Sequence, residues 1–302
     1  PYLLERVDDA AVVQLYADGF AGLPLDQKTL IWHLYEAALA GRDIYTDQRY
    51  AHNLAMRDFL EALVLHHGAL PADVATEIWR YTKLFWINSG PFNNLTARKF
   101  VLKLGVEELA RAAAAAAAAG ARFRTAPGES PADLARRLAP ALLDPAMDAM
   151  VTNKTPGAGG DILRDSANNL YDGVAMADLE GFVERYPLNS RLVKRDGQLV
   201  EEVYRVGGRY DAELRRMIGH IEAALPFATP SFATALRALI QWYRTGEDSD
   251  RTAFDIAWVQ STDSPVDTMS GFIEVYMDAR GIKGAWESMV YYVNHEKTAR
   301  IR

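Results

Sequence analysis

The sequence contains no cysteine among its 302 residues. This absence excludes a disulfide framework, thiol catalysis and zinc bound by cysteine, and it is compatible with either the cytoplasm or the periplasm. Positive charge is also scarce, because 33 lysine and arginine residues stand against 40 aspartate and glutamate residues, for a net charge of -7. We therefore expect no broad surface for the phosphates of a nucleic acid.

Long hydrophobic runs are missing as well. A helix that spans a bilayer needs about 18 or more apolar residues, and the best candidate, 112–119, is short and flanked by Arg111 and Arg122. No membrane span is expected. The chain starts at Pro1 instead of methionine, which is compatible with removal of a signal peptide, a tag or a longer leader.

Apolar residues at helical spacing dominate the first part of the chain. Asp26 is a suitable N-cap for a helix expected to stop at Gly41, and Gly68 is a suitable stop for the next one. Pro71 fits the first turn of a third helix, and the alanine run is a strong helix former. The predicted helices run over about 26–41, 47–67, 71–88, 107–119 and 132–138.

Strand signals begin near residue 191. Asp196-Gly197 is a strong hairpin signal between two short apolar runs, and further strand-like runs cover 255–260, 266–278 and 286–293. Two amphipathic helices, over 211–224 and 230–245, separate the two groups. The fold class is therefore predicted as α+β, mostly helical, with a small antiparallel sheet of about five strands that resembles a barrel in the C-terminal third. We expect a helical part over 1–190 and a strand-containing part over 191–302 of the same lobe.

Catalytic and metal-binding motifs are not found. His295-Glu296 resembles the start of a zinc-peptidase helix, but such a helix needs a second histidine one turn later, where the chain has Ala299 and Arg300. His66 and His67 are adjacent and point to different sides of a helix. Nucleophile and phosphate-binding motifs are also missing. No catalytic residue and no metal ligand is therefore assigned to this chain.

The segment 86–96 is the first candidate for ligand binding. A helix is expected to stop at Ser89-Gly90-Pro91, next to Asn88, Asn93 and Phe92. Amide side chains both donate and accept hydrogen bonds, which suits the backbone of an extended peptide. The alternative is an ordinary helix end, in which the asparagine side chains form hydrogen bonds with the backbone of their own loop.

The segment 258–274 is the second candidate. Asp267 lies near the start of a predicted strand, where its carboxylate could pair with the ammonium group of a ligand. The alternative is a solvated charge at the edge of the sheet.

Both candidate segments resemble sequence motifs of the dipeptidyl peptidase III family. Asn88-Ser89-Gly90-Pro91-Phe92 and Arg98-Lys99-Phe100-Val101 resemble the family's Asn-x-Gly-Asn-Tyr and Thr-Lys-Phe-Val. Trp258-Val259-Gln260 and Gly271-Phe272-Ile273-Glu274-Val275-Tyr276-Met277-Asp278 resemble its Trp-Ile-Gln and Gly-Phe-Ile-Glu-x-Tyr-x-Asp, with the same spacing. Further similarity lies in 168–174, 186–191 and 286–294.

The resemblance implies a two-lobed zinc aminopeptidase that removes dipeptides from the N-termini of short peptides, with the substrate lying between the lobes as an added strand. One lobe contains a five-stranded barrel with helices around it, and this chain is similar to that lobe. The other lobe carries zinc on motifs that would follow residue 302. The implied cofactor is zinc in the intact parent, and the implied partners are peptide substrates and the C-terminal zinc-binding lobe.

The family's substrate-binding residues correspond to several positions here. The glutamate that holds the substrate amine corresponds to Asp267, and a tyrosine of the cleft corresponds to Met269. Asp267 keeps the negative charge but has a shorter side chain, and Met269 lacks the hydroxyl group. These two differences leave open whether dipeptides are released or whether the exopeptidase preference is shifted or broader. The complete set of expected substrate-binding residues is Asn88, Ser89, Gly90, Phe92, Asn93, Gln260, Asp267 and Met269.

The sequence therefore predicts the substrate-binding lobe of a zinc-dependent dipeptidyl peptidase, inactive when alone. The alternative is a peptide-binding or regulatory protein without catalysis that retains this lobe alone.

Overall fold

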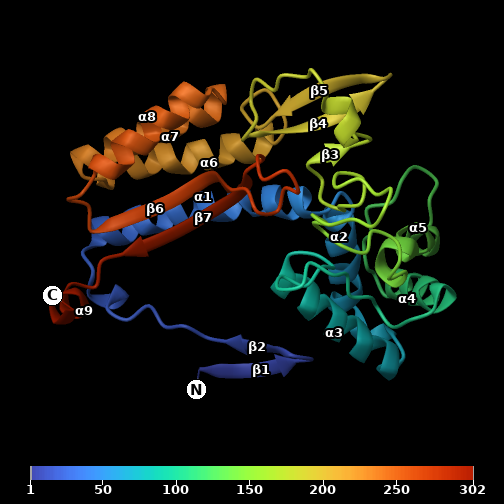
Figure 1. The fold of residues 1–302 in the computed structure, drawn as a ribbon. Coiled ribbons are helices and arrows are strands. Elements are labelled where there is room, and N and C mark those ends of the chain that lie inside the picture. The colour runs from blue at the N-terminus through green and yellow to red at the C-terminus, as the bar shows by residue number, and fades with distance from the viewer. Residues whose placement is uncertain (1, 302) are drawn as a thin grey trace. The chain divides into compact units, whose positions relative to one another are not determined.

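The computed structural model describes residues 2–301 (Figure 1). The chain divides into two compact units. The first contains the chain up to Leu15 together with Thr46–Asn169, and the second contains Tyr16–Tyr45 together with the chain from Leu170 onward. The expected division near residue 190 groups the chain by type of element, whereas these units group it by packing. In the described part of the chain, no helix is long and apolar enough to span a bilayer.

The first unit is a helical body with one hairpin. Its elements are β1 (Leu3–Val7), β2 (Ala10–Val13), α2 (Asn53–Leu65), α3 (Ala72–Asn88), α4 (Val106–Ala118) and α5 (Pro131–Leu143). Small side chains on the inner face of α4, such as Ala113 and Ala116, are completely buried in the core of this unit. Their size allows close approach of neighbouring helices, so the alanine run is used for packing as well as for helix propensity.

The second unit combines helices with two small sheets. Its elements are most of α1 (Leu25–Arg49), then β3 (Tyr171–Asp172), β4 (Ser190–Arg195), β5 (Gln198–Val203), α6 (Asp211–Ala224), α7 (Pro230–Thr245), α8 (Asp248–Gln260), β6 (Val266–Glu274), β7 (Ala285–Tyr292) and α9 (His295–Ile301). The core of the unit joins side chains of α1, α6 and α7 with Val266, Phe272 and Trp286 of the β6–β7 pair. In Figure 1, α1 runs along one face of this pair.

The structure confirms a mostly helical chain with small sheets, but the residues that it describes do not form the expected five-stranded sheet. Among the described residues, β3, β4 and β5 form one sheet of three strands, while β1–β2 and β6–β7 are separate two-stranded sheets.

The strand predicted over 255–260 is wrong, because this run belongs to α8. Arg251 pairs with Asp248 three residues before it and with Asp255 four residues after it, which are pairings that only a helix brings together. Phe254 and Trp258 share one side of the same helix. The local pattern of alternating apolar residues was therefore weaker than the helical pattern of the longer segment.

The hairpin predicted at Asp196-Gly197 is confirmed. Strands β4 and β5 are antiparallel, and Arg195 pairs with Gln198 across a two-residue turn. Asp196 and Gly197 both have positive φ angles, of 50° and 78°. Two consecutive left-handed residues are what a turn of this type requires, and aspartate and glycine tolerate them best.

Gly41 lies inside α1 and does not end it, contrary to the sequence prediction. A Cβ atom at this position would lie 2.2 Å from Cζ2 of Trp286, a buried side chain of β7. The glycine is therefore required by the close approach of the indole ring, and the helix continues to Arg49.

We expect Gly41→Ala to destabilise the protein by about 1–3 kcal/mol, because the added methyl group must displace a packed tryptophan. Gly219→Ala in α6 is the matched control. A Cβ atom added at Gly219 would have no neighbouring atom within 4 Å, so the helical preference for alanine should stabilise the protein by about 0.5–1 kcal/mol. Urea unfolding followed by tryptophan fluorescence measures both values. Equal effects of the two substitutions would contradict this explanation of Gly41.

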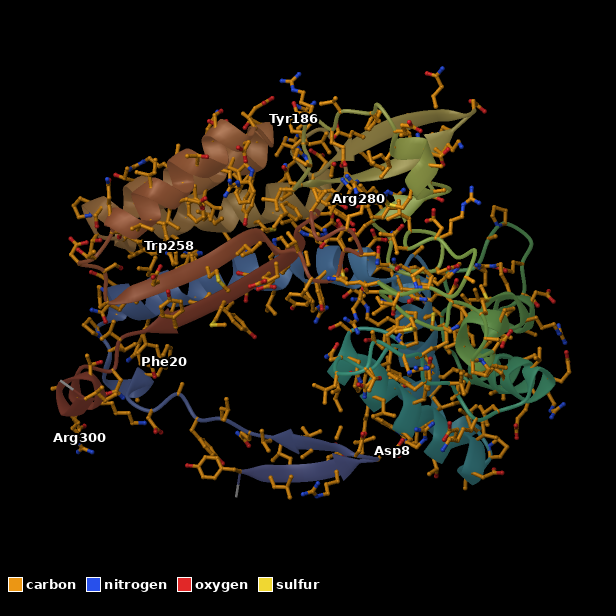
Figure 2. All side chains as sticks on the ribbon, viewed as in Figure 1. Asp8, Phe20, Tyr186, Trp258, Arg280 and Arg300 are labelled. Carbon is orange, nitrogen blue, oxygen red and sulfur yellow. The ribbon has the colours of Figure 1, made fainter. Side chains whose placement is uncertain are left out.

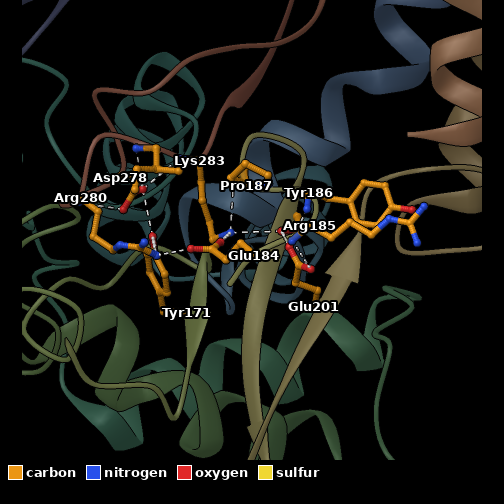
Figure 3. A network of polar contacts seen from close by, with 11 residues as sticks. Tyr171, Glu184, Arg185, Tyr186, Pro187, Glu201, Asp278, Arg280 and Lys283 are labelled. Carbon is orange, nitrogen blue, oxygen red and sulfur yellow. Dashed lines mark hydrogen bonds and ion pairs between the residues drawn. The ribbon is translucent and has the colours of Figure 1, made fainter. Parts of the chain in front are cut away.

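A buried charge network fixes the segment before β4 (Figure 3). The ammonium group of Lys283 is completely buried and lies 2.6 Å from Oε2 of Glu184, while Arg280 lies 2.6 Å from Oε1. Lys283 also donates to the hydroxyl group of Ser190. Burial lowers the pKa of Lys283, although Glu184 opposes that shift. Burial alone would raise the pKa of Glu184, but the two cations bring it below its ordinary value.

Asp278 holds the other end of this network. Its side chain is completely buried, and its carboxylate accepts hydrogen bonds from the backbone N–H groups of Arg280, Ile282 and Lys283 and from the hydroxyl group of Tyr171. These bonds shape the connection between β6 and β7. The network therefore ties that connection to the segment that leads into β4 (Figure 3).

Candidate functional site

Strands β6 and β7 present a face with few covering side chains. The register places Asp267 opposite Tyr291, Met269 opposite Met289, and Gly271 opposite Glu287. These residues alternate with the buried Val266, Thr268 and Ser270, as expected for a strand with one covered face. The open face of this pair therefore carries the carboxylates of Asp267 and Glu287, the phenol of Tyr291 and two methionines.

Asp267 is held in place by neutral hydrogen-bond donors. Its Oδ1 atom accepts from Nε1 of Trp258 at 2.8 Å and from the backbone N–H of Thr268 at 2.7 Å. Its Oδ2 atom accepts from the hydroxyl group of Tyr291 at 2.7 Å. Among the residues that the structure describes, no lysine, arginine or histidine forms an ion pair with this carboxylate. The negative charge is thus oriented but not neutralised.

Tyr291 remains a donor to Asp267 at ordinary pH. Partial burial, the hydrogen bond to Asp267 and the charge of that carboxylate together raise the pKa of Tyr291 to about 12. The phenol therefore keeps its proton, and the orientation of Asp267 persists, throughout the physiological range.

The structure brings some of the predicted residues of this segment together and separates one. Met269 lies two residues from Asp267 on the same face of β6. Trp258, which is labelled in Figure 2, belongs to α8 and donates to Asp267. Gln260 is exposed at the end of α8. Because helix positions advance by roughly 100° per residue, Gln260 points to a different side of α8 from Trp258.

Trp258 and Tyr291 are the two contacts of Asp267 that the sequence interpretation did not assign. The sequence marks Trp258 only as part of a motif, and Tyr291 only as part of a strand. The role of Tyr291 depends on the register of β6 and β7, which the sequence does not reveal across so long a connection. The role of Trp258 depends on the packing of α8 beside β6.

In the first unit, the loop after α3 uses its asparagines for its own structure. Asn88 donates to the carbonyl oxygen of Leu84 and accepts from the backbone N–H of Asn94, both at 2.9 Å. The side-chain oxygen of Asn93 accepts from the N–H groups of Leu95 and Thr96. These bonds are those of an ordinary helix end followed by an Asx turn.

The remaining predicted residues of this loop are positioned by the core. Ser89 ends α3 with a φ angle of 52°, and its carbonyl oxygen accepts from Nδ2 of Asn53 at 3.0 Å. Gly90 lies so close to Asn53 that a Cβ atom would come within 2.6 Å of Nδ2. The ring of Phe92 is fully buried and packs edge-on against Tyr50. These three residues therefore shape the loop from inside.

A cavity of about 360 Å³ lies beside this loop within the first unit. The loop contributes Asn88, Asn93, Asn94, Leu95 and Thr96, and the turn of the β1–β2 hairpin contributes Asp8 and Asp9. The hairpin is fastened to α3 by ion pairs from Arg80 to Asp8 and from Lys83 to Glu5, each at 2.7 Å. The loop thus borders a hollow with polar walls.

The described residues do not fit a metal site. No group of three or more histidine, aspartate and glutamate side chains that could hold a metal ion is present in residues 2–301 as far as the structure describes them. Helix α9 begins at His295, whose side chain lies outside the described part of the chain. The described side chains therefore offer no ligand set for zinc.

Comparison with known proteins shows similarity to a family of peptidases in the C-terminal part of the chain. Residues 181–302, which contain Asp267, Trp258 and the charged residues of the buried network, match Peptidase family M49. Dipeptidyl peptidase 3 of Dictyostelium discoideum is 30% identical to this chain over 106 residues, which are 35% of this chain and 15% of that protein.

Solved structures with a similar fold extend over nearly the whole chain. DPP III from Caldithrix abyssi matches with a TM-score of 0.62 and 19% identity, covering 95% of this chain and 43% of that one. Dipeptidyl-peptidase III from Corallococcus sp. strain EGB matches with a TM-score of 0.61 and 17% identity, covering 96% and 43%. The chain thus spans less than half the length of these relatives. The expected resemblance to the dipeptidyl peptidase III family is confirmed.

Proposed function

We propose that this chain is the substrate-binding lobe of a zinc-dependent exopeptidase that releases dipeptides from the N-termini of peptides. The observation that carries the proposal is the carboxylate of Asp267, which is oriented by Trp258 and Tyr291 and lacks a cationic partner among the described residues. The match of residues 181–302 to a peptidase family also supports a role in peptide hydrolysis.

The α-ammonium group of a peptide is the ligand that suits Asp267. A carboxylate offers about four positions for hydrogen-bond donors, and three of these are occupied by Trp258, Thr268 and Tyr291. The position left on Oδ2 accepts an N–H of the ammonium group, and opposite charges strengthen that bond. The side chain would therefore select peptides with a free, protonated N-terminus.

The loop in the first unit has a separate role in this proposal. Asn88 and Asn93 keep the loop rigid, since their side chains bond to it, while the neighbouring exposed groups border the cavity beside α3. Backbone groups and exposed side chains of the loop would contact the peptide, and Ser89, Gly90 and Phe92 would position them. Met269 offers no hydroxyl group, so its contribution would be apolar contact.

The zinc ion and the second lobe belong to the proposed whole enzyme and not to this chain. Zinc bound there would activate water and polarise the scissile carbonyl group. This chain would hold the peptide N-terminus, and Gln260, exposed at the end of α8, would lie at the margin of the site.

Binding of a tetrapeptide with a free N-terminus tests the proposal. We expect isothermal titration calorimetry to show at least about tenfold tighter binding of Ala-Ala-Ala-Ala than of its N-acetylated form, because acetylation removes the charge. Binding should weaken as the pH rises above about 8, where the α-amino group loses its proton.

Equal affinity for the two peptides, or no binding of either, would contradict the proposal. An assay on the full-length parent with a dipeptidyl-naphthylamide, together with its zinc content, then separates a peptidase from a binding protein. Binding with neither turnover nor zinc would favour the regulatory alternative.

A further inference from the structure

A cavity of about 410 Å³ lies between α8 and β6, entirely within the second unit. Its walls are mostly apolar and include Trp242, Phe254, Trp258, Met269, Phe272 and Ile273. Cavities of this size and composition are typical of sites that enclose a small apolar group. No step of the proposed amine recognition uses this hollow.

The base of the cavity is formed by packed aromatic rings. The ring of Trp242 stacks on Phe254 with an interplanar angle of 18° and meets Phe272 edge-on at 90°. Gly271, with a φ angle of 153°, allows this arrangement, because a Cβ atom there would lie 2.6 Å from the ring of Trp242. A packed aromatic base does not need to rearrange before a ligand enters, which lowers the free-energy cost of binding.

The polar wall of the cavity carries more negative than positive charge. Arg251 pairs with Asp248 at 3.0 Å and with Asp255 at 2.6 Å, so one cation faces two carboxylates. Partial burial raises the pKa of Asp255, although Arg251 opposes the shift. An acidic group entering the cavity would meet this excess of carboxylates, whereas an uncharged group would not be repelled.

The cavity and the amine-binding carboxylate share a wall. The indole ring of Trp258 lines the cavity while its N–H group donates to Asp267. Met269 also lines the cavity and lies two residues from Asp267 on the same face of β6, a spacing of roughly 7 Å along a strand. The first side chain of a peptide held at Asp267 is within that reach.

We propose that this cavity binds the side chain of the N-terminal residue of the ligand and selects a large apolar side chain, above all an aromatic one, over a small or acidic one. The inference rests on the proposed function, because Asp267 must hold the amine for the first side chain to reach the cavity. It adds a preference among peptides that the amine alone does not provide.

Three tetrapeptides that differ only in the first residue test the proposal. Calorimetry is expected to show that Phe-Ala-Ala-Ala binds about tenfold or more tightly than Ala-Ala-Ala-Ala, because an aromatic ring is removed from water. Glu-Ala-Ala-Ala should bind more weakly than the alanine peptide. The variant Met269→Trp fills the cavity and should abolish the preference for phenylalanine over alanine.

Met289→Trp is the matched control. Met289 lies directly opposite Met269 in the register and is 56% exposed, but it does not line the cavity. This variant should keep the preference for phenylalanine. A measurement on the unaltered protein does not depend on the folding of the variants. In NMR spectra of ¹³C-methyl-labelled methionine, addition of Phe-Ala-Ala-Ala should shift the signal of Met269 more than that of Met289.

The outcomes separate this inference from the proposed function. If free-amine peptides bind but phenylalanine and alanine bind equally, or if the Met289 signal shifts more than the Met269 signal, the cavity is not the side-chain pocket while amine binding stands. If no peptide binds, both proposals are overturned. A preference that Met269→Trp removes and Met289→Trp keeps supports the pocket.

Discussion

Replacement of Glu184 by glutamine is expected to lower the free energy of unfolding of the second unit by about 3–5 kcal/mol, the cost of breaking a buried ion pair by removing one partner. Lys283 is completely buried. Its ammonium group also donates to neutral oxygens of Ser190 and Pro187 and lies 5.7 Å from the centre of the Tyr171 ring. Without the carboxylate of Glu184, the folded protein must either bury the lysine's charge without its ion-pair partner or release the lysine's proton, because Asp278 and Glu201 act on it only as further charges. Both alternatives are costly.

A double variant separates the charge from the shape of the site. In Glu184→Gln with Lys283→Met, the buried cation is gone and the amide still accepts from Arg280. Apolar replacement of a buried charge is often neutral or stabilising, so this protein should be more stable than the Glu184→Gln variant alone. The coupling energy of the cycle measures the pair directly.

The control is an exposed ion pair of the same unit. Glu222 and Arg244 pair at 2.6 Å but are about half exposed, so Glu222→Gln should change stability by less than about 1 kcal/mol. Urea unfolding measured by tryptophan fluorescence reports all of these variants. The difference between wild type and Glu184→Gln should also shrink in acid, because the pKa of Glu184 is lowered and its contribution is lost as the pH falls through that value. Equal effects at Glu184 and Glu222 would contradict a structural role of the network.

Local signals in the sequence predicted those elements whose ends are set by their own residues. Helix α7 begins with Pro230 after the side-chain cap of Thr229 and ends at Gly246 in a left-handed conformation, and the hairpin turn at Asp196-Gly197 requires little beyond those two residues. Such features depend on short stretches of chain. They were therefore predictable before any tertiary contact was known.

Tertiary contacts decided the elements that were predicted incorrectly. Gly41 has the composition of a helix stop, but it is a contact point for Trp286, which is distant in sequence. The run 255–260 has a strand-like composition, but the ion pair between Asp255 and Arg251 and the packing of α8 against α7 require a helix. The prediction of a single barrel-like sheet is wrong for the same reason. One of its expected strands is part of helix α8, and the others pair in separate sheets.

The sequence indicates the carboxylate of the candidate site but not the groups that surround it. Asp267 lies near the start of β6 and is half-buried. Its donors come from α8 and from β7, and only the folded register brings Tyr291 opposite it. In the loop after α3, the sequence predicts that the asparagines contact a ligand. In the structure, the side chains of Asn88 and Asn93 accept hydrogen bonds from the backbone of the loop itself.

Asp267→Asn is expected to weaken binding of a free-amine peptide by about 10- to 100-fold, because a hydrogen bond between two charged groups becomes one to a neutral amide. The N-acetylated peptide should lose almost nothing, so the two peptides should bind with similar affinity to the variant. Asp196→Asn is the control, since it removes the same charge at an exposed hairpin turn where asparagine is equally suited.

The direction of this result depends on the neighbours of Asp267. Trp258 and Tyr291 hold the carboxylate whether or not a ligand is present, so the side chain does not need to be ordered by the peptide, and the charge itself accounts for the difference. Loss of the charge also removes one of the causes that raise the pKa of Tyr291, and a lower tyrosine pKa in the variant, measured by NMR titration, would report that the contact existed. If Asp267→Asn weakened the free and acetylated peptides equally, Asp267 would be a structural residue and the amine would be held elsewhere.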